Sequence, residues 1–149
     1  MAKKFKFKLE PILNIRTENV EEAKTSLYTA VRSRYKKEYE IENLNNIKEE
    51  FLNEPQITSK AADMQVYKDY VNNIDWQLQK KEEEKIKLLE IENQKREVLN
   101  EALKEEKVII KLKEKKIEEH QKQLNKEEAN FLDEIGTNRY IKNMKDNYL

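Results

Sequence analysis

Apolar residues in the first third of the chain recur at intervals of three and four and so define one seam. Its members are Val20, Ala23, Leu27, Ala30, Ile41, Leu44 and Phe51. The other positions at this spacing are basic, namely Arg34, Lys37 and Lys48. Because the spacing is typical of a helix that packs against another helix in a coiled coil, we predict a helix over about residues 9–52.

The first predicted helix is followed by a short break at Asn53, Glu54 and Pro55. Proline and the residue before it both disfavour a continuing helix, so we expect a turn over about residues 53–60. Two helices joined by so short a connection run antiparallel, so positions whose numbers add to about 113 should face each other. This register would bring the arginines at positions 32 and 34 toward the glutamates at positions 82–84.

A second helix is predicted over about residues 61–135, with Thr58 or Ser59 as its N-cap. Apolar residues recur in it at multiples of seven, at Leu89, Leu103, Ile110, Ile117, Leu124 and Phe131. Before this series, the spacing of three and four is kept by Tyr67, Val71, Ile74 and Leu78. Residues 79–85 contain no apolar side chain, and beyond them the seam resumes about one position displaced. This displacement predicts a local stutter in the coiled coil.

The only glycine, Gly136, is expected to end the second helix in the left-handed conformation and to leave a tail over residues 136–149. At about 1.5 Å per residue, the first helix would measure roughly 65 Å and the second roughly 110 Å. Residues beyond about Leu103 would then overhang the first helix, and their apolar stripe would need a cover from elsewhere. The predicted fold is one all-α domain over residues 1–149, an antiparallel two-helix coiled-coil hairpin with a longer second helix.

Composition narrows the range of functions. Charged residues make up 40% of the chain and hydrophobic residues 37%, which is too little apolar surface for a compact globule. The 30 basic and 30 acidic residues are interspersed, so nucleic acid is not an expected partner. No apolar run approaches the roughly 20 residues of a membrane-spanning helix, and residues 1–9 lack the apolar stretch of a signal peptide. We therefore expect a cytoplasmic protein.

Residue types that support catalysis or metal binding are scarce. One glycine cannot form a phosphate-binding loop, and one histidine, His120, with no cysteine gives too few ligands for a typical zinc site. His120 is instead expected on a solvated helix face. Pairs of acidic residues arise by chance at this composition, so none is assigned to acid or base catalysis. We expect no enzyme activity, no cofactor, no metal and no small-molecule substrate.

Aromatic residues are candidates for contacts within the hairpin or with partners. Three of them should cap the seam near the predicted turn: Phe51, Tyr67 and Tyr70. Tyr28 and Tyr35, seven positions apart, are expected to flank the seam and shield it. Trp76 lies two positions beyond Ile74 and should point away from the seam, which makes it a candidate interface hot spot.

Two stretches of the chain carry a family resemblance. Residues 5–16 have the pattern F-x-F-x-L-x-P-I-L-x-I-R, and residues 131–139 read FLDEIGTNR with a Leu-Asp-Glu-Ile core. These stretches resemble the start and the C-terminal signature of the flagellar export protein FliJ family, and the resemblance runs from end to end of the chain. It implies a component of the flagellar type III export apparatus, built like the coiled-coil stalk of a rotary ATPase.

The resemblance also implies partners. In that family the chain ends project into the centre of the export ATPase hexamer, the hairpin region contacts the membrane export gate, and export chaperones are escorted. A stalk-like activator of the ATPase, peripheral to the cytoplasmic membrane at the flagellar base, is therefore implied here. The implied gate contacts, with the Trp76 candidate added, are Leu44, Ile47, Phe51, Tyr70, Ile74 and Trp76. The expected contacts with the ATPase ring are Phe5, Phe7, Leu9, Ile110, Ile117, Leu124 and Phe131.

Some alternatives stay open at this point. Ile110, Ile117 and Leu124 are expected to face either residues 5–15 or the ATPase ring. The stalk protein of a virulence-type secretion system would show the same sequence chemistry. A self-assembling structural coiled coil would cover its stripe with a second copy, and sedimentation would distinguish it from a monomer that docks on partners.

Overall fold

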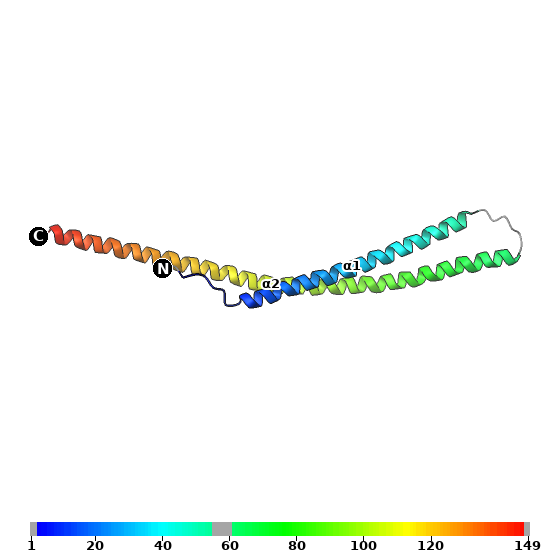
Figure 1. Cartoon of the computed structure of the whole chain (residues 1–149), viewed down its shortest axis with the longest axis horizontal. Helices are drawn as coiled ribbons and strands as arrows, with labels where there is room; N and C mark the ends of the chain where they lie inside the picture. Colours follow the sequence, from blue (N-terminus) through cyan, green and yellow to red (C-terminus); the bar gives the residue numbers. More distant parts are fainter. Residues whose placement is uncertain (1–2, 55–60, 148–149) are drawn as a thin grey trace. The chain divides into compact units, whose positions relative to one another are not determined.

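The computed structural model describes residues 3–54 and 61–147. In these residues the chain forms two α-helices and no strand (Figure 1), α1 over Glu10–Asn53 and α2 over Ala61–Asn147. The predicted all-α class is therefore confirmed, and α2 with 87 residues is longer than α1 with 44.

Contacts divide the chain into two units. The hairpin unit is Glu18–Leu103, and the terminal unit consists of residues 1–17 and 104–149. Each unit contains part of α1 and part of α2.

The start of α1 follows from its first residues. Pro11 lies in the first turn, where its missing N–H removes no helical hydrogen bond. The backbone N–H of Glu10 donates to the carbonyl of Phe7 at 3.1 Å, and that of Leu13 donates to the carbonyl of Leu9 at 2.9 Å. These bonds join residues 3–7, which belong to no helix or strand, to the start of α1.

The predicted end of the second helix is wrong, because α2 continues through Gly136 to Asn147. Gly136 does not have a positive φ, and the side-chain hydroxyl of the next residue, Thr137, donates to the carbonyl of Asp133 at 2.9 Å. One glycine costs about 1 kcal/mol in a helix interior, and helix-forming residues on both sides of Gly136 outweigh that cost. The N-caps predicted at positions 58 and 59 lie outside the described residues.

The core of the hairpin unit is a narrow line of side chains between α1 and α2, which lie side by side in Figure 1. Its buried apolar residues are Val20, Ala23, Ala30, Ile41 and Ile74. The first four belong to the seam predicted for the first helix, and that seam is confirmed. Its members Leu27, Leu44 and Phe51 are half-buried.

The first part of the seam predicted for the second helix is confirmed, because Tyr67, Val71 and Leu78 are half-buried and Ile74 is buried. From Leu89 onward, the predicted seam is wrong by one position. Leu89 and Leu103 are exposed, whereas their neighbours Leu88 and Ala102 are half-buried. The more buried side chains recur at three and four residues through the stretch that has no apolar residue, at Ile74, Leu78, Lys81, Lys85, Leu88, Glu92, Lys95 and Leu99. No stutter is therefore needed in this stretch, because charged residues occupy the seam positions.

The register of the hairpin unit also differs from the prediction. Ion pairs join Lys37 to Glu84 at 2.7 Å, Glu40 to Lys81 at 2.9 Å, and Lys48 to Asp75 at 2.5 Å. The numbers of these partners add to 121, 121 and 123, so the predicted value of about 113 is wrong. Charge pairing and burial along the seam set the register, and the midpoint of the connection does not.

In the terminal unit, the first residues of the chain pack on α2. Arg16 pairs with Glu105 at 2.6 Å and Glu10 with Lys113 at 2.9 Å, while the rings of Phe5 and His120 have centroids 5.5 Å apart. From residue 121 to residue 147, every side chain is exposed except those of Leu124 and Ile135, which are half-buried. The C-terminal part of α2 therefore presents most of its side chains to solvent.

Candidate docking surfaces

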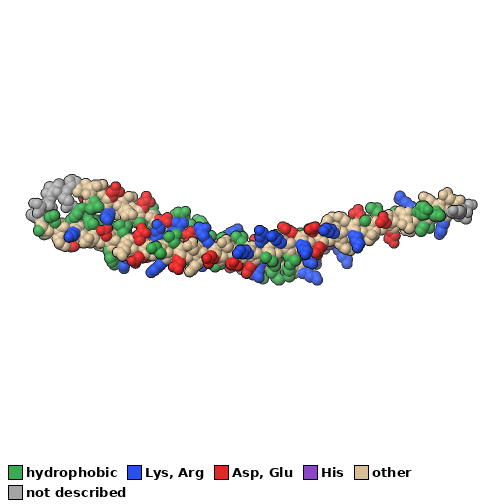
Figure 2. All heavy atoms as spheres, turned by 180° about the vertical axis from the view of Figure 1, so that it is seen from behind, with side chains coloured by type: hydrophobic (Ala, Val, Ile, Leu, Met, Phe, Trp, Pro, Cys, Tyr) green, Lys and Arg blue, Asp and Glu red, His purple; other side chains and the backbone are tan. Residues whose placement is uncertain are grey.

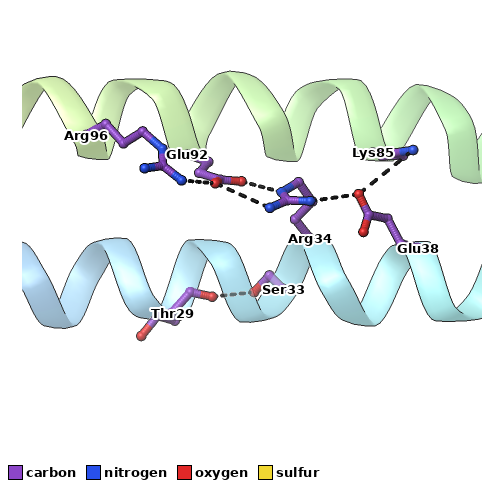
Figure 3. Close-up of polar contacts among 7 residues, drawn as sticks. All are labelled: Thr29, Ser33, Arg34, Glu38, Lys85, Glu92 and Arg96. Carbon is purple, nitrogen blue, oxygen red and sulfur yellow. Dashed lines mark hydrogen bonds and ion pairs between the residues drawn. The ribbon is translucent and has the colours of Figure 1, made fainter.

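The centre of the hairpin seam is charged, and its charged side chains pair with one another (Figure 3). Arg34 donates from Nε to the Glu92 carboxylate and from Nη1 to Glu38 Oε1 at 2.7 Å. Arg96 donates to the same Glu92 at 2.8 Å, and Lys85 lies 3.9 Å from Glu38. Glu92 is only 3% exposed, so it is a buried carboxylate held between two arginines.

These contacts explain the shifted pKa values in the seam. Hydrogen bonds from Arg34 and Arg96 hold the pKa of the Glu92 carboxyl below its ordinary value of 4.5. The bonds to Glu92 and Glu38 raise the pKa of the Arg34 guanidinium. The same logic raises the pKa of Lys37, which bonds Glu84 and Glu40. The expectation that Arg34 approaches residues 82–84 is wrong, because Arg34 pairs with Glu92 and Lys37 pairs with Glu84.

An aromatic cluster lies at the end of the hairpin unit nearest the connection. The ring of Phe51 lies 4.8 Å from that of Tyr67 and 4.3 Å from that of Tyr70, centroid to centroid. Phe51 is half-buried, while Tyr70 and Ile47 remain exposed. The rings therefore pack across α1 and α2 and leave the outer edge of the cluster open.

The six residues assigned to the export gate do not form one surface. Leu44 and Phe51 are half-buried in the seam, and Ile74 is among the most buried residues of the chain. Trp76 is exposed, and the Lys80 ammonium lies 4.2 Å from the centroid of its ring. Of the six, Ile47, Tyr70 and Trp76 are the ones with exposed side chains. Sequence reasoning did not find Lys80, although its spacing of four residues from Trp76 is the usual signal for such a contact.

The N-terminal residues form a groove on α2 in the terminal unit. Phe5, Phe7 and Leu9, all half-buried, line it together with Leu112 and His120 of α2. The groove has a volume of about 800 Å³, and several lysines are among the residues that line it. The expectation that His120 lies on a solvated face is wrong, because its ring packs against that of Phe5.

A separate apolar stripe lies on α2 of the terminal unit and does not line this groove. Ile110, Ile117 and Phe131 are 37%, 45% and 62% exposed, and Leu124 is half-buried. At about 100° per residue, these four positions fall within roughly 60° of one another on the helix surface. Residues 5–9 line the groove with Leu112 and His120 instead, and Ile110, Ile117 and Phe131 stay exposed.

Three tyrosines of α1 were assigned wrongly or missed. Tyr28 and Tyr35 were expected to shield the seam, but they are 67% and 60% exposed, and Tyr39 is 64% exposed. The three positions fall on one side of α1, away from the seam residues Arg34 and Ile41. The spacing of seven between the first two was compatible with either arrangement, because it says only that they share a face.

Over the range the structure describes, no three His, Cys, Asp or Glu side chains come together as ligands for a metal ion. No helix in the same range has an apolar stretch long enough to cross a membrane. Figure 2 shows acidic and basic side chains interspersed among hydrophobic ones on the face it presents.

Comparison with known proteins places this chain in a family. A family model described as "Flagellar FliJ protein" matches residues 5–145, which include the N-terminal groove residues, the charged seam and the apolar stripe. No curated protein and no solved structure matches the chain. Because the matched region covers more than half of the sequence, the chain belongs to the flagellar FliJ protein family.

Proposed function

We propose that this export-associated flagellar protein is a non-catalytic stalk that couples the export ATPase to the export gate and escorts export chaperones. In this proposal it works in the cytoplasm, at the membrane face of the flagellar base. The terminal unit docks in the ATPase ring, and the hairpin unit meets the cytoplasmic domain of the gate.

The open stripe on α2 is the observation that carries the proposal. In a chain with 37% hydrophobic residues, Ile110 and Ile117 are costly to leave in water, and residues 5–9 pack elsewhere. Exposed apolar side chains that share one helix face usually mark an interaction surface. The groove in the same unit adds half-buried Phe5 and Phe7, and lysines also line it, so a partner there would meet apolar and cationic groups together.

The ATPase contact is tested by Ile117→Glu, which places a charge on the stripe. We expect binding to the purified export ATPase to weaken at least about tenfold, because a carboxylate would be buried without a partner. The matched control is Val108→Glu. Val108 is 64% exposed and lies nine residues from Ile117, which puts it about 180° away around α2. Equal binding by both variants would contradict the ATPase assignment.

The gate contact is tested at Ile47, which is 45% exposed beside the aromatic cluster. Ile47→Glu should weaken binding to the soluble gate domain and leave ATPase binding unchanged. Leu52→Glu is the control, because Leu52 is 48% exposed and about 140° away on α1. If Leu52→Glu weakens gate binding as much as Ile47→Glu, this side of the hairpin unit is not the gate contact.

A further inference from the structure

Three exposed tyrosines form a line on the solvent side of α1 in the hairpin unit. Tyr28, Tyr35 and Tyr39 fall within roughly 40° on the helix surface at about 100° per residue, and Arg32 completes the row between them. Their direction is about 140° from the buried seam, so α2 does not cover them. Tyr and Arg are enriched among the residues that dominate binding energy at protein interfaces.

The spacing of this tyrosine face repeats that of the seam. Residues 28, 32, 35 and 39 follow one another at intervals of four, three and four, which is the a/d spacing of a coiled coil. The same intervals lead outward through Thr25 to Glu21 at one end and directly to Glu42 at the other. An aromatic and cationic patch about three helical turns long is therefore bounded by carboxylates, and its shape suits one further helix.

Two cations near this face have no acidic partner among the residues that the structure describes. Arg32 and Lys36 form no ion pair with any residue the structure describes, whereas Lys24 is paired with Glu21 at 3.4 Å. The nearby Glu38 is already engaged by Arg34 and Lys85. A partner would therefore need to bring its own carboxylates, and a second copy of this face would bring more cations.

The middle of the face is held in place from below. The guanidinium carbon of Arg34 lies 4.7 Å from the centroid of the Tyr35 ring, and Arg34 is fixed in turn by Glu92 and Glu38. A side chain that is ordered before binding loses less entropy when a partner arrives. Tyr35 therefore packs against an arginine of the charged seam, whereas Tyr28 and Tyr39 on either side of it are exposed.

From spacing, charge and anchoring together, we propose that the tyrosine face, Tyr28, Arg32, Tyr35 and Tyr39, docks one acidic amphipathic helix of another protein as a third helix. Apolar residues of that helix pack between the tyrosine rings, and its carboxylates pair with Arg32 and Lys36. This surface is separate from the residues proposed for the ATPase and the gate.

The proposal is tested with a designed helical peptide that carries Leu at a and d positions and Glu at the flanking positions. We expect fluorescence anisotropy to detect binding of this peptide to the full chain, and binding should weaken as salt is raised. A peptide with Lys in place of Glu should bind at least about tenfold more weakly. The double variant Tyr28→Ala/Tyr39→Ala should lose at least about tenfold in affinity for the acidic peptide, and Phe at both positions should restore most of it.

Tyr140→Ala is the matched control, because Tyr140 is 65% exposed in the terminal unit and lies on neither surface. Circular dichroism of the double variant should match the unchanged chain, since neither Tyr28 nor Tyr39 is buried. Absence of peptide binding, equal binding of the Lys peptide, or equal loss in Tyr140→Ala would overturn the proposal. So would dimerisation at micromolar concentration that the double variant abolishes, because the occupant would then be a second copy. ATPase and gate binding should be unaffected by the double variant, so its outcome is distinct from that of the proposed function.

Discussion

Alanine replacement of Ile47 and of Ile74 tests how much each side chain contributes to the free energy of unfolding. The resemblance assigned both to the gate, yet Ile74 is 4% exposed and Ile47 is 45% exposed. Replacing either by alanine removes the same three carbon groups. At about 0.8 kcal/mol per buried carbon, Ile74→Ala should cost about 2.3 kcal/mol, and more if a cavity remains. Ile47→Ala should cost roughly 1.3 kcal/mol by the same reckoning.

The assay is urea unfolding of the full chain followed by circular dichroism. With an m value of about 2 kcal/mol per molar urea, Ile74→Ala should lower the midpoint by about 1.2 M and Ile47→Ala by about 0.6 M. Gate binding is measured without urea, at a temperature where both variants are folded. There Ile47→Ala should weaken gate binding more than Ile74→Ala, because the side chain of Ile47 is exposed to a partner and that of Ile74 is not. Equal midpoint shifts, or a larger one for Ile47→Ala, would refute the placement of the seam.

Two further predictions concern the charged seam and the long helix. Because the folded pKa of Glu92 lies below 4.5, its contribution to stability is present above about pH 4.5 and is lost as pH falls through the lowered value. The urea midpoint should therefore drop from pH 6 to pH 3, and Glu92→Gln should start lower and drop less; parallel curves for both proteins would contradict the pairing. Gly136→Ala should stabilise α2 locally by about 0.5–1 kcal/mol, because Gly136 is helical and an added Cβ meets nothing within 4 Å. Slower amide exchange over residues 130–142 is the expected readout, and faster exchange would show that the helix breaks at the glycine.

Sequence pattern predicted α1 well because its seam is marked by apolar residues. Val20, Ala23, Ala30 and Ile41 are hydrophobic, regularly spaced and buried, so periodicity alone finds them. In α2 the same spacing is occupied by Lys81, Lys85 and Glu92, which a hydrophobic pattern treats as solvent-facing. Their burial depends on partners in α1 that no local rule can identify.

The errors at single residues have a similar cause. Glycine is common at helix ends, which is why Gly136 was predicted to end the second helix. Its neighbours and the absence of a following proline let α2 continue instead. His120 was placed by the acidic residues beside it in sequence, whereas Phe5, more than a hundred positions away, decides its surroundings. The sequence pattern placed Ile117 and Phe131 in an uncovered apolar stripe, and both are exposed. The same pattern also placed them in line with Leu89, whereas the buried seam includes its neighbour Leu88 instead.

Site-specific crosslinking is the most direct test of the central claim, which is that the apolar stripe of α2 contacts the export ATPase. The chain contains no cysteine, so Ile117→Cys and Val108→Cys can each carry a single photoreactive label on otherwise unchanged protein. The account predicts that the label at Ile117 crosslinks to the export ATPase and that the label at Val108 does not. Crosslinking of equal yield from both positions, or from Val108 alone, would contradict it.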